Sequence, residues 1–379
     1  MRILVLGYII RAPYGGSCFH HLQYLLGLKK LGHEVYFYED SNDYPGFDNE
    51  KSIETAQYLG FSFIKNLFSY YGLEGSWSFF NAKSNTWYGL SKNKFLAFCS
   101  VADIVINISG VNPIREWFAK IPVRAFIDTD PTFTQIKHLT QPILNQLASD
   151  HTCHFSFAEN IGNEKCLIPN DGFVWKPTRQ PVILEIWKNS DIDREHSKWT
   201  TVMQWESYNS QQYNGQLYGM KSLSFEEYIF LPKKLDDEFE VAISSSLDIM
   251  NYLRKNGWSV IPSLIPTKTF LSYQDYILAS KGEWSVAKHG YVHSNSGWFS
   301  ERSLSYMASS KPVVIQDTGF SNFLPCGVGL MPFTTLEEAE DSIDRVNSDY
   351  ISHCKKARQI VEEFFDSSIV LQKILEEMS

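Results

Sequence analysis

The sequence lacks the spacing patterns of the common metal and redox sites. Its six cysteines are scattered, without any Cys-x-x-Cys pair, and no cluster of histidine, cysteine and carboxylate residues stands out. We therefore expect no metal site and reduced thiols. No apolar run is long enough to span a bilayer, and the N-terminal run is too short for a secretory signal. Together these absences predict a cytoplasmic protein without a membrane span.

An excess of positive charge is also missing. The chain has 34 lysines and arginines against 43 aspartates and glutamates, a formal net charge of -9. This balance disfavours nucleic acid as a partner, without excluding it, because nonspecific nucleic-acid binding depends on a basic field. Aromatic residues make up 15% of the chain. Their rings suit stacking on sugars or bases, and they equally suit an aromatic-rich core.

The length of 379 residues exceeds what one hydrophobic core supports, so two domains are expected. An apolar strand over 2–6, a leucine-striped helix ended by Gly32 and a second strand over 33–38 predict a β-α-β unit. Further strands are expected at 104–108 and 123–127.

The second half repeats this alternation. We expect an α/β protein with two Rossmann-like domains that face each other across a cleft. The expected boundaries are an N-terminal Rossmann-like domain over 1–165, an interdomain linker over 166–196, a C-terminal Rossmann-like domain over 197–360, and a final helix over 361–379 that returns to the N-terminal domain.

The richest segment for chemistry runs from Lys288 to Phe320. It contains a loop of serine, asparagine and glycine, a helix expected to begin at Glu301 after the capping residue Ser300, and a buried strand that ends at Asp317. A helix N-terminus offers free N–H groups and a positive dipole end, which suit a diphosphate.

Within this segment, Met307 to Val314 reads Met-Ala-Ser-Ser-Lys-Pro-Val-Val. This passage resembles the nucleotide-sugar segment of GT-B glycosyltransferases, and Pro13 to Glu39 is similar to their glycine-rich acceptor-side loop and following helix. The resemblance implies a metal-independent hexosyltransferase that uses a nucleotide-diphosphate sugar, such as a UDP-sugar, and has no resident cofactor. Many family members have a ribose-binding glutamate where this chain has Ser305, and Glu301 lies one turn earlier.

Candidate site residues follow from these two segments and from the strand end at 128–130. The predicted donor-binding residues are Gly15, Gly16, Lys288, His289, Ser296, Gly297, Ser300, Glu301, Arg302, Asp317, Thr318 and Gly319. The predicted catalytic residues are His20, Asp128 and Asp130, since an imidazole or a carboxylate can accept the proton of an acceptor hydroxyl.

Three alternatives remain open at this point. One is a noncatalytic nucleotide- or sugar-binding protein of the same fold. Another is an NAD-dependent oxidoreductase, although the first strand is not followed by a Gly-x-Gly-x-x-Gly turn. The third is a variant of the glycosyltransferase hypothesis, in which the acceptors are modified DNA bases. The sugar, the choice between uridine and guanosine, the acceptor and the stereochemistry stay undetermined.

Overall fold

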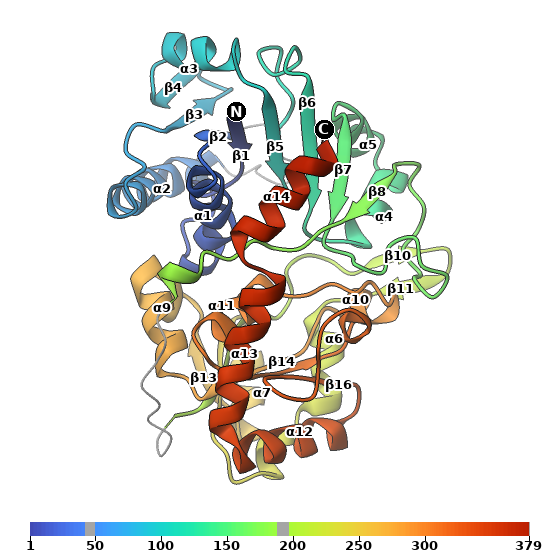
Figure 1. Ribbon diagram of the computed structural model, residues 1–379. Helices are drawn as coiled ribbons and strands as arrows, with labels where there is room; N and C mark the ends of the chain where they lie inside the picture. Colours follow the sequence, from blue (N-terminus) through green and yellow to red (C-terminus); the bar gives the residue numbers. More distant parts are fainter. Residues whose placement is uncertain (42–49, 188–196, 379) are drawn as a thin grey trace.

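The computed structural model describes residues 1–41, 50–187 and 197–378, with the backbone alone for 50–58. It consists of two α/β halves, one above the other in Figure 1, and each is built on a largely parallel sheet. This agrees with the predicted fold class. The two termini of the described chain lie close together on the upper half.

The sheet of the first half has eight strands in the order β4-β3-β2-β1-β5-β6-β7-β8. Only β4 runs antiparallel to its neighbour. The strands are β1 (Arg2–Leu6), β2 (Glu34–Asp40), β3 (Trp77–Asn81), β4 (Thr86–Gly89), β5 (Ile104–Ile108), β6 (Val123–Asp128), β7 (Cys153–Ser156) and β8 (Trp175–Pro177). The helices are α1 (Gly15–Lys30), α2 (Glu50–Tyr70), α3 (Lys92–Cys99), α4 (Phe133–Thr140) and α5 (Pro142–Ser149).

The sheet of the second half has six parallel strands in the order β13-β12-β9-β14-β15-β16. They are β9 (Trp199–Gln204), β12 (Phe239–Ser244), β13 (Ser259–Pro262), β14 (Gly282–Ser285), β15 (Val313–Gln316) and β16 (Leu330–Phe333), and a separate hairpin joins β10 (Gln211–Tyr213) to β11 (Gln216–Tyr218). The helices are α6 (Lys221–Phe225), α7 (Leu247–Lys255), α8 (Leu264–Thr267), α9 (Phe270–Ala279), α10 (His289–His293), α11 (Glu301–Ala308), α12 (Leu336–Ser348), α13 (Tyr350–Phe364) and α14 (Ser367–Met378).

Two local expectations are wrong. Ser224 to Glu227 has the pattern of a capping box, which predicts a helix start there, but Ser224 lies inside α6, which begins at Lys221. The stretch rich in serine, asparagine and glycine before Glu301, expected to be a loop, opens with α10. In contrast, α11 begins at Glu301, and the Ser300 hydroxyl accepts a hydrogen bond from the Arg302 N–H, as the sequence predicts.

The chain passes between the halves twice. The expected linker over 166–196 contains β8, which is the last strand of the first sheet, and its residues 188–196 lie outside the described residues. At the other end, α14 crosses to the first half (Figure 1) and packs against α1, where Gly27 leaves room for Leu371.

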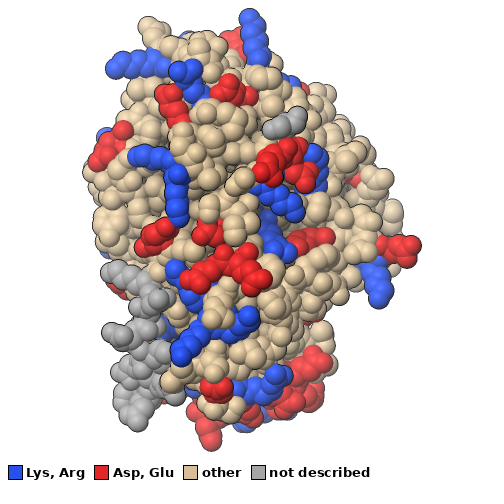
Figure 2. Space-filling view, in the orientation of Figure 1, with Lys and Arg blue, Asp and Glu red and all other residues tan. Residues whose placement is uncertain are grey.

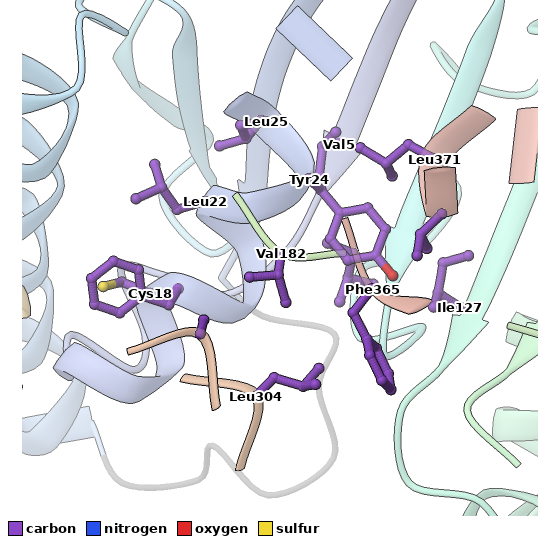
Figure 3. Packing of buried hydrophobic residues seen from close by; sticks show 14 of the residues in the cluster. Val5, Cys18, Leu22, Tyr24, Leu25, Ile127, Val182, Leu304, Phe365 and Leu371 are labelled. Atoms are coloured by element: carbon purple, nitrogen blue, oxygen red, sulfur yellow. The ribbon is translucent and has the colours of Figure 1, made fainter. Parts of the chain in front are cut away.

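One hydrophobic core connects the two halves. Figure 3 shows Cys18, Leu22 and Leu25 of α1 with Leu304 of α11 and Leu371 of α14 in the same cluster. Because burial of apolar surface is the main driving force for folding, this shared core holds the two sheets in a fixed relation. The edges of both sheets at which the parallel strands end therefore face one cavity.

Candidate functional site

A cavity of about 910 Å³ lies between the halves. Pockets for a single drug-sized ligand run to roughly 300–1,000 Å³, so this one has room for a large donor. Among its walls are loops that follow the strands β1, β5, β6, β9 and β14, together with the starts of α1 and α11. In doubly wound sheets, ligands bind at this edge.

The middle of the cavity holds a polar cluster that joins the two halves. The Lys288 ammonium of the second half lies 2.7 Å from Asp130 Oδ1 of the first half and 3.0 Å from the Tyr208 hydroxyl. The hydroxyls of Tyr208 and Tyr291 both donate to the Asp130 carboxylate. Burial alone would raise the pKa of Asp130, but the charges of Lys288 and Lys137 outweigh it and hold that pKa below its ordinary value. Asp130 is thus a fully paired carboxylate.

Asp128 is placed differently. It is completely buried and does not line the cavity. Its carboxylate accepts hydrogen bonds from Thr134 Oγ1 at 2.7 Å, Ser156 Oγ at 2.8 Å and Gln135 Nε2 at 3.0 Å. These bonds tie the end of β6 to α4, so the geometry gives Asp128 a structural role rather than the predicted catalytic one.

Arg302 lines the cavity, but its guanidinium is turned toward its own half. Its Nε donates to the fully buried Glu283, its Nη2 donates to Ser285 Oγ at 2.7 Å, and its Nη1 donates to the Val202 carbonyl at 3.0 Å. A guanidinium has five N–H donors, and these contacts use three of them. The Nε donor of Arg302 is therefore engaged by Glu283, and the other two N–H groups make no hydrogen bond within the described residues.

Lys221, at the first position of α6, was not singled out from the sequence. It lines the cavity and is only 9% exposed. Within the described chain its ammonium forms no hydrogen bond or ion pair, whereas Lys288 and Arg302 are both paired. Burial, together with the nearby charges of Arg302 and Lys288, lowers the pKa of Lys221 well below its ordinary value. An anion at this point would relieve that cost.

The N-terminus of α11 opens into the same space. Ser300, Glu301, Arg302 and Ser305 all line the cavity. The Ser300 hydroxyl satisfies the Arg302 N–H, while the Glu301 and Ser303 N–H groups make no hydrogen bond within the described residues. Ser305, where the resemblance places a glutamate, donates back to the Glu301 carbonyl at 3.2 Å. The carboxylate of Glu301 has no partner among the described residues.

On the opposite wall, His20 of α1 lines the cavity. Its Nε2 atom is buried without a hydrogen-bond partner in the described structure, and burial lowers the pKa of His20, so the imidazole is neutral near pH 7. Gly16 also lines the cavity, whereas Gly15 is pressed against α9, where an added Cβ would lie 2.5 Å from Tyr273 Cβ. Gly15 thus serves the packing of the two halves.

The remaining predicted donor residues do not line the cavity. His289 Nδ1 accepts from the Gly219 N–H, and Asp317 Oδ1 accepts from the Gly319 N–H. Ser296, Gly297 and Thr318 build turns outside the cavity, where the Thr318 carbonyl accepts from the Gly297 N–H and the Ser296 carbonyl accepts from the Asn160 N–H of the first half. The structure separates these six residues, His289, Ser296, Gly297, Asp317, Thr318 and Gly319, from Lys288, Ser300, Glu301 and Arg302.

Across the described ranges, no group of three or more histidine, cysteine, aspartate or glutamate side chains is arranged to hold a metal ion. Over the same residues, no helix combines the length and the apolar character that crossing a bilayer requires. Basic and acidic side chains alternate on the face shown in Figure 2, and neither sign forms a broad field there.

Comparisons with known proteins agree on the fold. No family model and no curated protein matches the sequence. An alpha-glucosyltransferase (AGT) in complex with UDP has a similar structure, with a TM-score of 0.60 and 12% identity over 100% of this chain and 99% of that one. Anabaena HepE in complex with UDP is also similar, with a TM-score of 0.56 and 12% identity over 100% of this chain and 99% of that one. Sucrose-phosphate synthase from Thermosynechococcus elongatus has a TM-score of 0.56 and 8% identity over the same shares of the two chains. The chain therefore has the GT-B fold that these glycosyltransferases share.

Proposed function

We propose that the protein transfers a hexosyl group from a nucleotide-diphosphate sugar to a hydroxyl-bearing acceptor. The observation that carries this proposal is that the unpaired Lys221, Arg302 and the N-terminus of α11 all line one cavity. Together they form a site for two adjacent phosphates. The GT-B fold supports it, because two of the similar solved structures, the alpha-glucosyltransferase and HepE, were solved in complex with UDP.

In this mechanism the negative charge that develops on the leaving diphosphate is stabilised by protein groups that are already in place. Lys221 supplies a full positive charge, and the Glu301 and Ser303 N–H groups supply dipoles at the start of α11. Such donors need little rearrangement during the reaction, since the shared core fixes them. We propose that they take the place of a metal ion.

The acceptor hydroxyl requires a proton acceptor or a hydrogen-bonding partner. His20 is the better candidate of the two predicted residues that line the cavity, since its imidazole is neutral and its Nε2 has no partner within the described structure. Asp130 is fully ionised and accepts from Lys288, Tyr208 and Tyr291, which makes it a poor base. We assign Asp130 to holding Lys288 and the two tyrosines in position.

A modified base in DNA is a second candidate acceptor. The alpha-glucosyltransferase was solved with a 13-mer DNA containing a HMU base, and its fold matches this chain over 100% of this chain and 99% of that one. The net charge of -9 gives no general attraction for DNA. This candidate therefore requires recognition inside the cavity rather than a basic surface.

The test is donor consumption by the purified protein. UDP-glucose, UDP-galactose, UDP-N-acetylglucosamine and GDP-mannose are each incubated with an acceptor mixture, and with duplex DNA with and without hydroxymethylated pyrimidines, and the released nucleoside diphosphate is measured. We expect release from at least one UDP-sugar, and loss of that release in the variant Lys221→Met. The exposed Lys255 at the end of α7 provides the control variant, Lys255→Met.

Tight UDP binding with no donor consumed under any acceptor condition would favour the noncatalytic binding protein. Binding of NAD without binding of any nucleoside diphosphate would favour the oxidoreductase. Either result contradicts the proposed transfer.

A further inference from the structure

Apolar residues of the first half form one part of the cavity wall, which we call the branch. Its walls are Gly110 and Val111 after β5, Phe126 of β6, and Leu144 and Leu147 of α5. An added Cβ at Gly110 would lie 2.0 Å from the ring of Phe126. The ring therefore packs directly against the Gly110 backbone and forms a flat apolar wall.

A polar side chain, His138, adjoins this apolar wall through its contact with the ring of Phe126. His138 of α4 is 6% exposed and belongs to the cavity wall. Its Nδ1 lies 2.8 Å from Asp171 Oδ2, and the other carboxylate oxygen accepts from Trp175 Nε1 at 2.9 Å. Because a carboxylate only accepts, Nδ1 donates to Asp171. The second ring nitrogen, Nε2, has no hydrogen-bond partner within the described residues.

The surroundings hold the His138 ring in one orientation. The ring stacks on Trp175 with an interplanar angle of 15° and meets the edge of Phe126 at 86°. Asp171 is itself buried at 8% exposure, and it accepts a third hydrogen bond, from the Phe173 N–H, at 3.3 Å. A buried imidazole that is oriented by a carboxylate and leaves one nitrogen unpaired is an arrangement suited to bind a ligand.

The branch is continuous with the proposed transfer site. Thr134 and His138 lie one helical turn apart on the same face of α4, about 5–6 Å between their Cβ atoms, and both line the cavity. Thr134 also accompanies Asp130, whose carbonyl accepts from its hydroxyl at 3.0 Å. A molecule seated in the branch thus reaches the middle of the cavity, between Lys288 and His20.

We propose that this branch is the acceptor subsite and that it binds a planar aromatic ring whose hydrogen-bond donor meets His138 Nε2. The apolar walls exclude a bare polyol, because its hydroxyls would lose hydrogen bonds to water there. A diphosphate is disfavoured there as well, since the two cationic side chains of the first half that line the cavity, Arg11 and Lys137, are paired with Glu39 and Asp130. This assignment rests on the proposed function, and it makes His138 a specificity-determining residue and Asp171 a positioning residue.

The test measures binding to the full chain saturated with UDP. The probes are 4-hydroxybenzyl alcohol, benzyl alcohol, which lacks the phenolic donor, and glycerol, which lacks the ring. We expect affinity to fall in that order, by about fivefold for the missing hydrogen bond. In His138→Phe, which removes Nε2, the two ring alcohols should bind equally, and His138→Gln, which restores a side-chain acceptor, should recover part of the difference.

Filling the branch gives the second readout. Val111→Trp should weaken the binding of 4-hydroxybenzyl alcohol by about tenfold or more, while the Kd of UDP stays within about twofold. Retained UDP binding also shows that the variant is folded. The control Leu139→Ala changes an exposed residue of α4, next to His138, and should alter neither the affinity for 4-hydroxybenzyl alcohol nor the Kd of UDP.

Two results overturn the subsite. One is equal affinity of Val111→Trp and the unmodified protein for 4-hydroxybenzyl alcohol. The other is weaker UDP binding by Val111→Trp with an unchanged melting temperature, which would place the nucleotide in the branch. If UDP does not bind the unmodified protein at all, the proposed function itself fails. The two failures are therefore distinguishable.

Discussion

The two ends of the cavity differ in how they deal with charge. At the end formed by the second half, the charges of Arg302 and Lys288 lower the pKa of Lys221, which has no protein partner among the described residues. At the end formed by α4 and α5, Phe126, Leu144 and Leu147 are apolar, while Lys137 is paired with Asp130 and the His138 imidazole is bound to Asp171. The proposed anionic donor at the first end and uncharged acceptor group at the second rest on this difference.

The largest effect is expected on stability, at the buried ion pair between Glu283 and Arg302. Glu283 is 0% exposed and pairs with Arg302. The change Glu283→Gln leaves the guanidinium without its counter-charge, so we expect a loss of about 3–5 kcal/mol in the free energy of unfolding. Urea denaturation measures it. A loss below about 1 kcal/mol would show that the Arg302 charge is not held by Glu283.

Lys221 comes next. Removing its charge in Lys221→Met should weaken the binding of UDP by about 1.5–3 kcal/mol, which is roughly a tenfold to hundredfold increase in Kd. Isothermal titration calorimetry measures the change, with Lys255→Met as the exposed control. An unchanged Kd would remove Lys221 from the donor site and, with it, the contrast between the two ends.

The pH dependence sharpens the same contrast. In the free protein the pKa of Lys221 is lowered by burial and by Arg302 and Lys288, and a bound diphosphate favours the charged form. UDP binding should therefore be accompanied by proton uptake, and UDP affinity should fall as the pH rises above the lowered pKa that Lys221 has in the free protein. Calorimetry in buffers of different ionisation enthalpy measures the uptake, which Lys221→Met should abolish. Proton release would contradict this sign.

The smallest effect is expected at the cap of α11. Replacing Ser300 by alanine removes the side-chain acceptor of the Arg302 N–H, and such losses cost about 1 kcal/mol. Thermal unfolding should show this decrease, together with a similar modest weakening of UDP. Unchanged UDP affinity would place the start of α11 away from the diphosphate.

Much of the fold could be predicted from the sequence because its signals are local. The glycines that end helices, the alternation of strands and helices, and the Ser300 cap all act within a few residues. The paired state of the site residues could not be predicted in this way. Arg302 pairs with Glu283 nineteen positions away, and Asp130 pairs with Lys288 across 158 positions.

Asp128 and Asp130 illustrate the same limit at short range. They are two positions apart, yet Asp128 lies within β6 and is sealed by α4, while Asp130 follows the strand and reaches the cavity. Lys221 and His138 stood in segments without a motif. Their significance comes from an unpaired atom beside a cavity, and only the three-dimensional arrangement shows which atoms remain unpaired.

Hydrogen exchange on UDP binding tests the distinction between the two ends most directly. Saturating UDP should protect backbone amides at the start of α6 and α11, over 221–225 and 301–305, and leave those of α4 and α5, over 133–149, unchanged. Protection confined to 133–149 would contradict the assignment of the charged end to the donor.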